Sequence, residues 1–317
     1  MTTHTPESAE NRIDPSFHHP ALFYTTEEDY LRGVGAFVRT EAAGGHPVLV
    51  AVPGPRLQLL REAVGTGDED VTFVDMRQAG RNPGRILSML QSFADRYPDR
   101  RPSIVGEPIW VGRTAAEVRE ATRHEALINL AFDGRPVTIL CPYDTALPER
   151  VLAEAHRTHP VVGAPDGYAH SPHYADPHTV CRDCDRPLEE PADPLVLHFT
   201  EQDLAEVRDT AGHWAQKAGL SSNRHTDWLL AVNEATGNSV RHGGGQGTLR
   251  LWRTADTLIA EVRDRGRLTD ALVGRRRPDP LSPFGGRGVW MMHQLCDLVE
   301  MRTPPSGLIV RMHLALD

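Results

Sequence analysis

The chain has 317 residues, a formal net charge of −9 at pH 7 and 39% hydrophobic residues, a length that suits two domains of ordinary size. Its acidic balance argues against a protein that binds nucleic acid directly over its whole surface. No apolar run approaches the roughly 18 residues of a membrane span. The start MTTHTPESAENR lacks the features of a secretory signal, so we expect a cytoplasmic protein with no membrane partner.

Lysine is almost absent, because Lys217 is the single lysine among 34 Lys and Arg residues. A P-loop places a lysine directly after its glycine-rich turn, and the sequence contains no Gly-Lys-Ser or Gly-Lys-Thr. Walker-type NTPases are therefore excluded, as are enzymes that use a Schiff-base lysine other than Lys217. The four cysteines are too few for a disulfide scaffold.

Residues 17–164 alternate between helical and strand patterns, after a polar tail at 1–16 that we expect to be disordered. Apolar residues at helical spacing predict helices, whereas short, fully apolar runs predict buried strands. We predict helices at 25–43, 56–64, 84–97, 114–132 and 147–160, and strands at 47–52, 71–76, 137–144 and from 103 onward. This alternation with short links is typical of an α/β domain with a mainly parallel sheet.

Residues 165–194 contain six prolines and little periodicity, which predicts an interdomain linker. The second domain, 195–317, mixes helices with antiparallel strands and is predicted to be α+β. Its strands are predicted at 195–200, as a pair within 248–264, and at 307–316, and its helices at 201–219, 226–243 and 288–301. A loop rich in Arg, Pro and Gly covers 265–287.

Three short motifs in the second domain carry the strongest chemical signal. In EATGNSVRHG, Glu234 and Asn238 share one helix face, where a carboxylate and an amide oxygen suit a largely hydrated Mg²⁺. Asp264 ends a predicted strand and can accept a hydrogen bond from an exocyclic amine, while Gly266 lets a flat ring approach the backbone. The glycines of GGRG at 285–288 open a helix, where they can form a nest for phosphates.

Taken in order, these motifs resemble the N-box, G1 and G2 motifs of the GHKL (Bergerat-fold) ATPases, and their short form is most similar to the RsbW-type anti-sigma factor and serine kinase branch. The resemblance covers 195–317 and implies a Bergerat sandwich that binds ATP and Mg²⁺. It implies that Asn238 ligates Mg²⁺ and that Glu234 is the catalytic base or positions water. The cofactor-binding residues that it implies are Asn238, His242, Asp264, Gly266, Gly286 and Gly288.

The same resemblance implies a regulator of transcription that binds a sigma factor, an anti-anti-sigma protein or both, and that phosphorylates the latter on Ser or Thr. Nucleotide would order the lid at 267–288. Arg265 and the Arg- and Pro-rich lid depart from the full kinase pattern, so a non-catalytic docking switch stays open as an alternative. A homodimer is a further expectation, since related modules often pair.

The first domain resembles the MEDS sensory domain, a degenerate relative of RecA-like ATPases, which agrees with the missing P-loop. The resemblance spans 17–162 and rests on FHHPALFY, GEPIWVGR, HEALIN and CPYD. It implies that this domain senses a small-molecule or protein signal. Open α/β sheets bind ligands outside the carboxyl ends of their strands. The candidate sensing residues at such positions or on the long helix are Glu107, Trp110, Glu125, Asn129, Tyr143 and Asp144.

Two further patterns lie outside these motifs. His124 and Glu125 begin like a phosphoacceptor box, but no Arg-Thr-Pro follows and their helix belongs to an α/β pattern, so a structural role is favoured. Two histidines and a C-x-x-C pair in the linker could complete a tetrahedral Zn²⁺ site or act as a thiol switch: His173, His178, Cys181 and Cys184. A metal or redox sensor therefore stays open beside a plain linker, while Cys296 is predicted to be a core residue.

Overall fold

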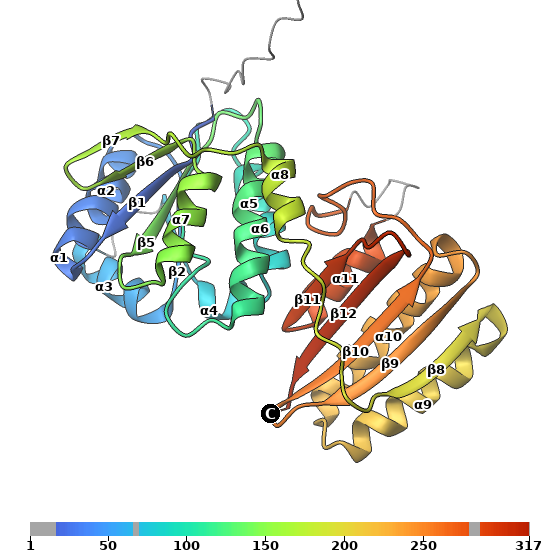
Figure 1. Ribbon diagram of the computed structural model, residues 1–317. Helices are drawn as coiled ribbons and strands as arrows, with labels where there is room; N and C mark the ends of the chain where they lie inside the picture. The colour runs from blue at the N-terminus through green and yellow to red at the C-terminus, as the bar shows by residue number, and fades with distance from the viewer. Residues whose placement is uncertain (1–16, 66–69, 279–285, 317) are drawn as a thin grey trace, which may run out of the picture.

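The computed structural model describes residues 17–65, 70–278 and 286–316, and Figure 1 shows two domains joined by one connecting segment. The expected tail at 1–16 lies outside the described residues. The first domain contains a seven-stranded sheet and the second a five-stranded sheet. The predicted architecture, a mainly parallel α/β domain followed by an α+β sandwich, is confirmed. No helix of the described residues is long and apolar enough to cross a membrane.

The sheet of the first domain has the order β3-β2-β4-β5-β1-β6-β7, and all its pairings are parallel except that of β6 with β7. Its strands are β1 (Pro20–Tyr24), β2 (Val48–Val52), β3 (Val71–Asp75), β4 (Ser103–Gly106), β5 (Thr138–Asp144), β6 (Val161–Ala164) and β7 (Gly167–His170). Because the parallel strands run in one direction, their carboxyl ends meet at one edge of the sheet.

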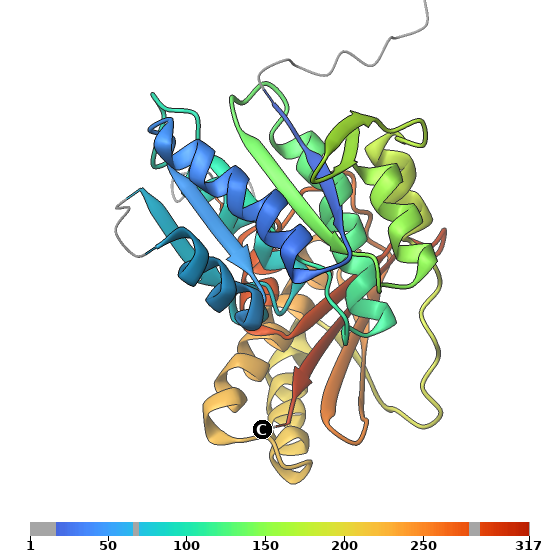
Figure 2. The same cartoon turned by 90° about the vertical axis from the view of Figure 1, so that its left-hand side faces the viewer.

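Helices cover both faces of this sheet (Figure 2). They are α1 (Glu27–Tyr30), α2 (Ala36–Ala43), α3 (Gly54–Val64), α4 (Met76–Ala79), α5 (Ile86–Ala94), α6 (Ala115–Ala131), α7 (Glu149–Thr158) and α8 (Pro177–Asp183), with the π-helical turn η1 (Leu31–Gly35) and the 3₁₀ turn η2 (Pro83–Arg85). Successive side chains of a strand point to opposite faces. Leu49 and Ala51 therefore join the core under α5, α6 and α7, whereas Val48 and Val50 join the core under α2 and α3.

The segment 165–194 differs from the expected plain linker, because much of it belongs to the first domain. It contains β7 and α8, and α8 packs against α6 with Val180 and Cys181 in the core. The helix was not predicted because the prolines of this segment indicate a loop. Pro177 occupies its first turn, where a backbone N–H has no intrahelical partner in any case, and Asp176 caps it. The connection between the domains is thus confined to the residues after α8.

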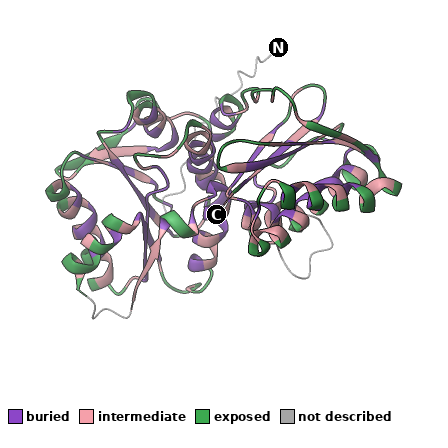
Figure 3. Ribbon diagram, turned by 90° about the horizontal axis from the view of Figure 1, so that it is seen from below, coloured by how far each residue is buried: buried purple, intermediate pink, exposed green. Residues whose placement is uncertain are grey.

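The second sheet is antiparallel throughout, in the order β11-β12-β10-β9-β8. Its strands are β8 (Leu195–Thr200), β9 (Gln246–Arg253), β10 (Thr257–Asp264), β11 (Leu298–Arg302) and β12 (Leu308–Ala315), and its helices are α9 (Leu204–Lys217), α10 (Ser222–His242) and α11 (Arg287–Leu295), with the 3₁₀ turn η3 (Glu201–Asp203). The helices pack on one face around Trp228 and Val232. Figure 3 shows the buried residues along the strands and on the sides of the helices that face them.

The helix predicted over 288–301 is wrong in its second half. The helix ends at Leu295, and Leu298–Arg302 forms β11, which pairs with β12. A short apolar run is compatible with either structure, and here the neighbouring strand decides. Cys296, between the two elements, is fully buried, as a core residue should be.

The outer face of the second sheet is charged and carries the connecting segment. Glu261 is buried on this face and accepts hydrogen bonds from Arg250, Arg263 and Arg311. Arginines of this face donate hydrogen bonds to the connecting segment. Arg302 donates to the carbonyl of Arg186, Arg311 donates to the carbonyl of Glu189, and Arg250 and Arg263 donate to the carboxylate of Glu190. The connection is therefore bound along the sheet.

Candidate functional site

A cavity of about 670 Å³ lies in the second domain between α10, α11 and the strands β10, β11 and β12. The seven residues that the motifs single out come from three separate parts of the chain. All of them line this one cavity: Glu234, Asn238, His242, Asp264, Gly266, Gly286 and Gly288. Residues 279–285 of the expected lid lie outside the described residues.

Helix α10 presents Glu234 and Asn238 to the cavity because its opposite side, with Trp228 and Val232, is buried in the core. The first turn of α11 lies directly against this pair. A Cβ added to Gly288 would come within 2.4 Å of Glu234 Oε2 and 3.0 Å of Asn238 Nδ2. The absence of a side chain at Gly288 therefore lets the N-terminus of α11 approach the carboxylate and the amide.

A second polar centre forms at the end of β10. Asp264 accepts a hydrogen bond from the Ser239 hydroxyl and one of 2.6 Å from the backbone N–H of Gly266. Added Cβ atoms at Gly243 and Gly266 would lie 2.4 Å from Asp264 Cγ and 2.7 Å from Asp264 Oδ1. Glycine at both positions thus keeps the space around the carboxylate open, and a carboxylate retains acceptor sites for a further donor.

The cavity fits an adenine nucleotide with Mg²⁺. Met292, Met301, Leu308 and Val310 give it an apolar wall on which a flat ring can lie. In the same cavity, the oxygens of Glu234 and Asn238 are hard ligands of the kind that Mg²⁺ takes. Arg241 already places a guanidinium beside them, because it donates to Asn238 Oδ1 at 2.9 Å and lies 4.0 Å from Glu234 Oε2.

The segment that follows the second motif reaches into the first domain. Leu268, Thr269 and Val273 line the nucleotide cavity, whereas Leu272 joins the hydrophobic core of the first domain. Arg275 is buried and forms an ion pair of 2.6 Å with Glu120 of α6. One short segment thus contacts both this cavity and the first domain.

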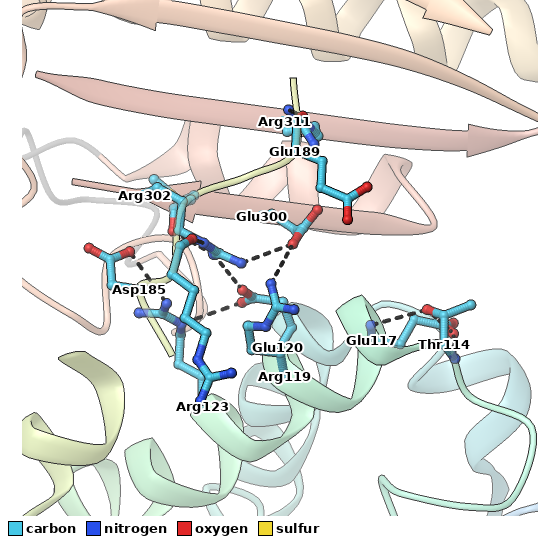
Figure 4. Close-up of polar contacts among 12 residues, drawn as sticks. Thr114, Glu117, Arg119, Glu120, Arg123, Asp185, Glu189, Glu300, Arg302 and Arg311 are labelled. Carbon is cyan, nitrogen blue, oxygen red and sulfur yellow. Dashed lines mark hydrogen bonds and ion pairs between the residues drawn. The ribbon is translucent and has the colours of Figure 1, made fainter. Parts of the chain in front are cut away.

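Glu120 is the centre of a charged network between the domains (Figure 4). Its carboxylate pairs with Arg275 at 2.6 Å, Arg302 at 2.9 Å and Arg123 at 3.6 Å. Burial alone would raise the pKa of Glu120, but the three guanidiniums lower it to about 2. Arg302 also pairs with Glu300 of β11, which adds a second carboxylate to the network. The ionised carboxylate therefore holds two buried arginines of the second domain.

The six candidate sensing residues form two groups rather than one site. Glu107, Trp110 and Asp144 line a cavity of about 150 Å³ near the carboxyl ends of β4 and β5. Glu107 accepts hydrogen bonds from the hydroxyls of Tyr24 at 3.0 Å and Tyr30 at 3.2 Å. Burial raises the pKa of Glu107 to about 7, although these hydroxyls and a nearby guanidinium act in the opposite direction.

The second group, Glu125, Asn129 and Tyr143, lies around three residues that sequence reasoning did not single out. His19, Cys141 and His159 place their ligand atoms with that of Glu125 so that all four lie within 4.8 Å of one another. Such a buried cluster could hold a metal ion. No spacing rule would have found it, because its members come from four separate elements.

The histidines and cysteines of the expected linker do not converge. Among the described residues, three or more potential metal ligands come together in the buried cluster at Glu125. None of His173, His178, Cys181 and Cys184 belongs to that cluster. Both thiols are buried among apolar side chains. Burial raises the pKa of Cys181, and it raises that of Cys184 to about 12, which disfavours the thiolate that a redox switch needs. His124 is also buried, which agrees with a structural role.

Two family models match the chain, one in each domain. Residues 18–160 match MEDS, the MEthanogen/methylotroph, DcmR Sensory domain, and residues 197–314 match the histidine kinase-like ATPase domain. The search of curated proteins finds no match. The first match covers β1 to β5 and ends before β6 and β7, whereas the second covers most of β8 to β12 and contains the nucleotide cavity. The chain therefore combines a MEDS sensory domain with a following histidine kinase-like ATPase domain.

Proposed function

We propose that this protein is an ATP- and Mg²⁺-dependent regulator of the anti-sigma type, whose ATPase domain binds a sigma factor or an anti-anti-sigma protein and phosphorylates the latter on Ser or Thr. The observation that carries the proposal is the single cavity that unites Glu234 and Asn238 of α10 with Asp264 and the glycines of α11. The order and short form of the motifs support the anti-sigma branch.

Each polar group of the cavity has a distinct role in this proposal. Asp264, fixed by Ser239 and by the Gly266 N–H, accepts a hydrogen bond from the adenine amino group. Asn238 holds Mg²⁺, which neutralises phosphate charge when bound. Glu234 orients the attacking hydroxyl and accepts its proton. Phosphoryl transfer depends mainly on positioning and charge stabilisation, so the enzyme needs no nucleophile of its own.

The sensory domain acts on this site through the segment that contacts both. Leu268 and Val273 of this segment line the nucleotide cavity. Leu272 joins the core of the sensory domain, and Arg275 is buried against it. A signal that shifts α6 would shift Glu120 and, through its ion pair, Arg275. The partner that binds would then depend on the state of the sensory domain.

The first test is calorimetric titration of the full chain with ATP, with and without Mg²⁺, beside an Asn238→Ala variant. We expect Mg²⁺-dependent binding that weakens at least about tenfold in the variant, or about 1.4 kcal/mol. Asn233→Ala is the matched control, because Asn233 is exposed on the same helix and does not line the cavity. Absence of ATP binding by folded wild-type protein would contradict the proposal.

Kinase activity is then separated from docking by Glu234→Ala. With a candidate anti-anti-sigma protein and labelled ATP, the wild type should transfer phosphate to Ser or Thr, and the variant should bind ATP and partner but lose transfer. If the wild type binds both and transfers nothing, the domain is a non-catalytic docking switch. Loss of partner response in Cys181→Ser with ATP binding retained would instead favour a sensor centred on the linker cysteines.

A further inference from the structure

The buried cluster in the sensory domain joins four elements at one point. His19 directly precedes β1, Glu125 lies on α6, Cys141 on β5, and His159 follows α7. All four residues are buried, with exposed fractions between 0% and 2%. Isolated charges and lone pairs at such depth are costly unless they are paired or bind a metal. The cluster therefore requires a chemical explanation.

The hydrogen bonds around the two histidines determine which ring nitrogens carry protons. His159 Nδ1 lies 2.8 Å from the carbonyl of Ala155, which can only accept, so this nitrogen is the donor. His19 Nδ1 lies 3.1 Å from Asn129 Oδ1, and Asn129 is oriented by its amide donation to the carbonyl of Thr158 at 2.8 Å. In the neutral rings, both Nε2 atoms therefore present lone pairs.

These two lone pairs face the same carboxylate oxygen. Glu125 Oε2 lies 3.2 Å from His19 Nε2 and 3.4 Å from His159 Nε2. His159 Nε2 and Glu125 Oε1 have no hydrogen-bond partner. The Cys141 thiol donates to Glu125 Oε2 at 3.4 Å, but neither imidazole has a proton to share with that oxygen, so two lone pairs face a carboxylate. A cation bound by all four groups, with the thiol deprotonated, removes this repulsion. Histidine ligands whose other ring nitrogen donates to a carbonyl or an amide oxygen are typical of metal sites.

Four of the six distances between the ligand atoms agree with the edges of a coordination tetrahedron, and the other two are at most 4.8 Å. With metal bonds of roughly 2.0 Å to N and O and 2.3 Å to S, as for Zn²⁺, tetrahedral angles place N and O about 3.3 Å apart and S about 3.5 Å from either. The observed distances are 3.2 and 3.4 Å for N to O, 3.4 Å from Cys141 Sγ to Glu125 Oε2, and 3.5 Å from Cys141 Sγ to His19 Nε2.

We propose that His19, Glu125, Cys141 and His159 form a closed four-ligand site for one zinc-type divalent ion. The mixture of two imidazoles, one thiolate and one carboxylate suits Zn²⁺, and four protein ligands leave no open position, as in structural sites. A cavity of about 680 Å³ that is lined by His19 and Asn129 lies beside the cluster. Bound metal ties β1, β5 and the end of α7 to α6, the helix that carries Glu120.

The test uses the full chain, stripped with a chelator and reconstituted with Zn²⁺ or Co²⁺. We expect one metal ion per chain by elemental analysis, and a Co²⁺ form with tetrahedral ligand-field bands and a thiolate-to-cobalt charge-transfer band. Cys141→Ser should abolish the charge-transfer band, and His159→Ala should reduce the stoichiometry at least tenfold. The matched control is Cys181→Ser with Cys184→Ser, which removes the other candidate thiols and should leave stoichiometry and spectrum unchanged.

X-ray absorption at the zinc edge keeps the test decisive if a variant fails to fold. The wild-type protein should show one sulfur at about 2.3 Å and three nitrogen or oxygen atoms at about 2.0 Å. Two sulfur ligands, or a charge-transfer band that the linker double variant removes, would place the metal at the C-x-x-C pair and overturn the proposal. A folded wild-type chain that retains no metal would overturn it as well.

Discussion

Gly288 shows how a single missing side chain shapes the nucleotide cavity. We predict that Gly288→Ala weakens ATP binding at least about tenfold, because its Cβ would lie 2.4 Å from Glu234 Oε2 and displace this carboxylate from its position beside Asn238. The measurement is calorimetric titration with Mg²⁺ and ATP. Gly167→Ala is the control, since an added Cβ there meets nothing within 4 Å. Unchanged affinity in Gly288→Ala would show that this contact does not shape the site.

At the scale of single residues, the sequence predicted the nucleotide cavity far better than the sensory cluster. Glu234, Asn238 and Asp264 could be found because each motif combines a polar residue with glycines at a spacing that only a few folds use. His19, Cys141 and His159 have no such spacing. Their significance depends on tertiary packing, which brings the ends of separate elements together, and on ring orientation, which only the hydrogen bonds reveal.

Helix α6 links the two functional regions of the molecule. Thr114 and Glu117 cap its start, Glu120 in its second turn faces the ATPase domain, and Glu125 and Asn129 face the buried cluster. A single helix is rigid over this length because each turn is hydrogen-bonded to the next. A displacement at one end is therefore transmitted to the other.

We predict that Glu120→Gln destabilises the protein by about 3 kcal/mol, because Arg275 and Arg302 lose a buried counter-charge. Since the folded pKa of Glu120, about 2, lies below its ordinary value of 4.5, the ionised carboxylate stabilises the fold above pH 4.5. That contribution is lost as the pH falls through this window toward 2. Urea unfolding between pH 2 and 7 should show a flatter pH dependence in the variant.

Glu149→Gln is the control for this prediction. The substitution removes the same charge from the chain, but Glu149 is exposed in the first turn of α7. It should leave both the free energy of unfolding and its pH dependence nearly unchanged. Equal effects of the two variants would mean that net charge, rather than the network at Glu120, governs acid stability.

Sequence reasoning missed β1, β6, β7, α8 and β11, and in α8 and β11 the environment overrides the local pattern. α11 and β11 lie in one apolar stretch of the sequence, so the helical pattern of α11 continues into β11. Only the pairing with β12 makes this second part a strand. α8 lies in a proline-rich stretch, and its seven residues are too few to show a clear period. The long helices and the fully apolar strands were predictable, since their patterns are strong enough to identify without neighbours.

At the scale of the whole molecule, the domains share a buried polar contact apart from the Glu120 network. The Asn82 amide donates to the carbonyls of His293 at 3.1 Å and Cys296 at 3.3 Å, and an added Cβ at Gly84 would meet the His293 ring. η2 and α11 are therefore in direct contact. We therefore expect the two domains to unfold together.

The prediction is that Asn82→Ala, which leaves two buried carbonyls without a donor, costs about 1–3 kcal/mol and separates the unfolding of the domains. In scanning calorimetry, Mg²⁺ and ATP should raise the Tm of the whole wild-type chain. In the variant they should raise the Tm of the ATPase domain and not that of the sensory domain. Two separate transitions already present in the wild type would contradict this coupling.

The connecting segment has a consequence for the ATPase domain taken in isolation. A fragment that begins at Leu197, where the family match begins, lacks the carbonyls and the carboxylate that bind the outer face of the sheet. It also lacks Glu120. The arginines that lose partners are Arg250, Arg263, Arg275, Arg302 and Arg311. Such a fragment would have a cationic face. Any affinity of the fragment for DNA, RNA or heparin would therefore result from the truncation and would not be a property of the intact protein.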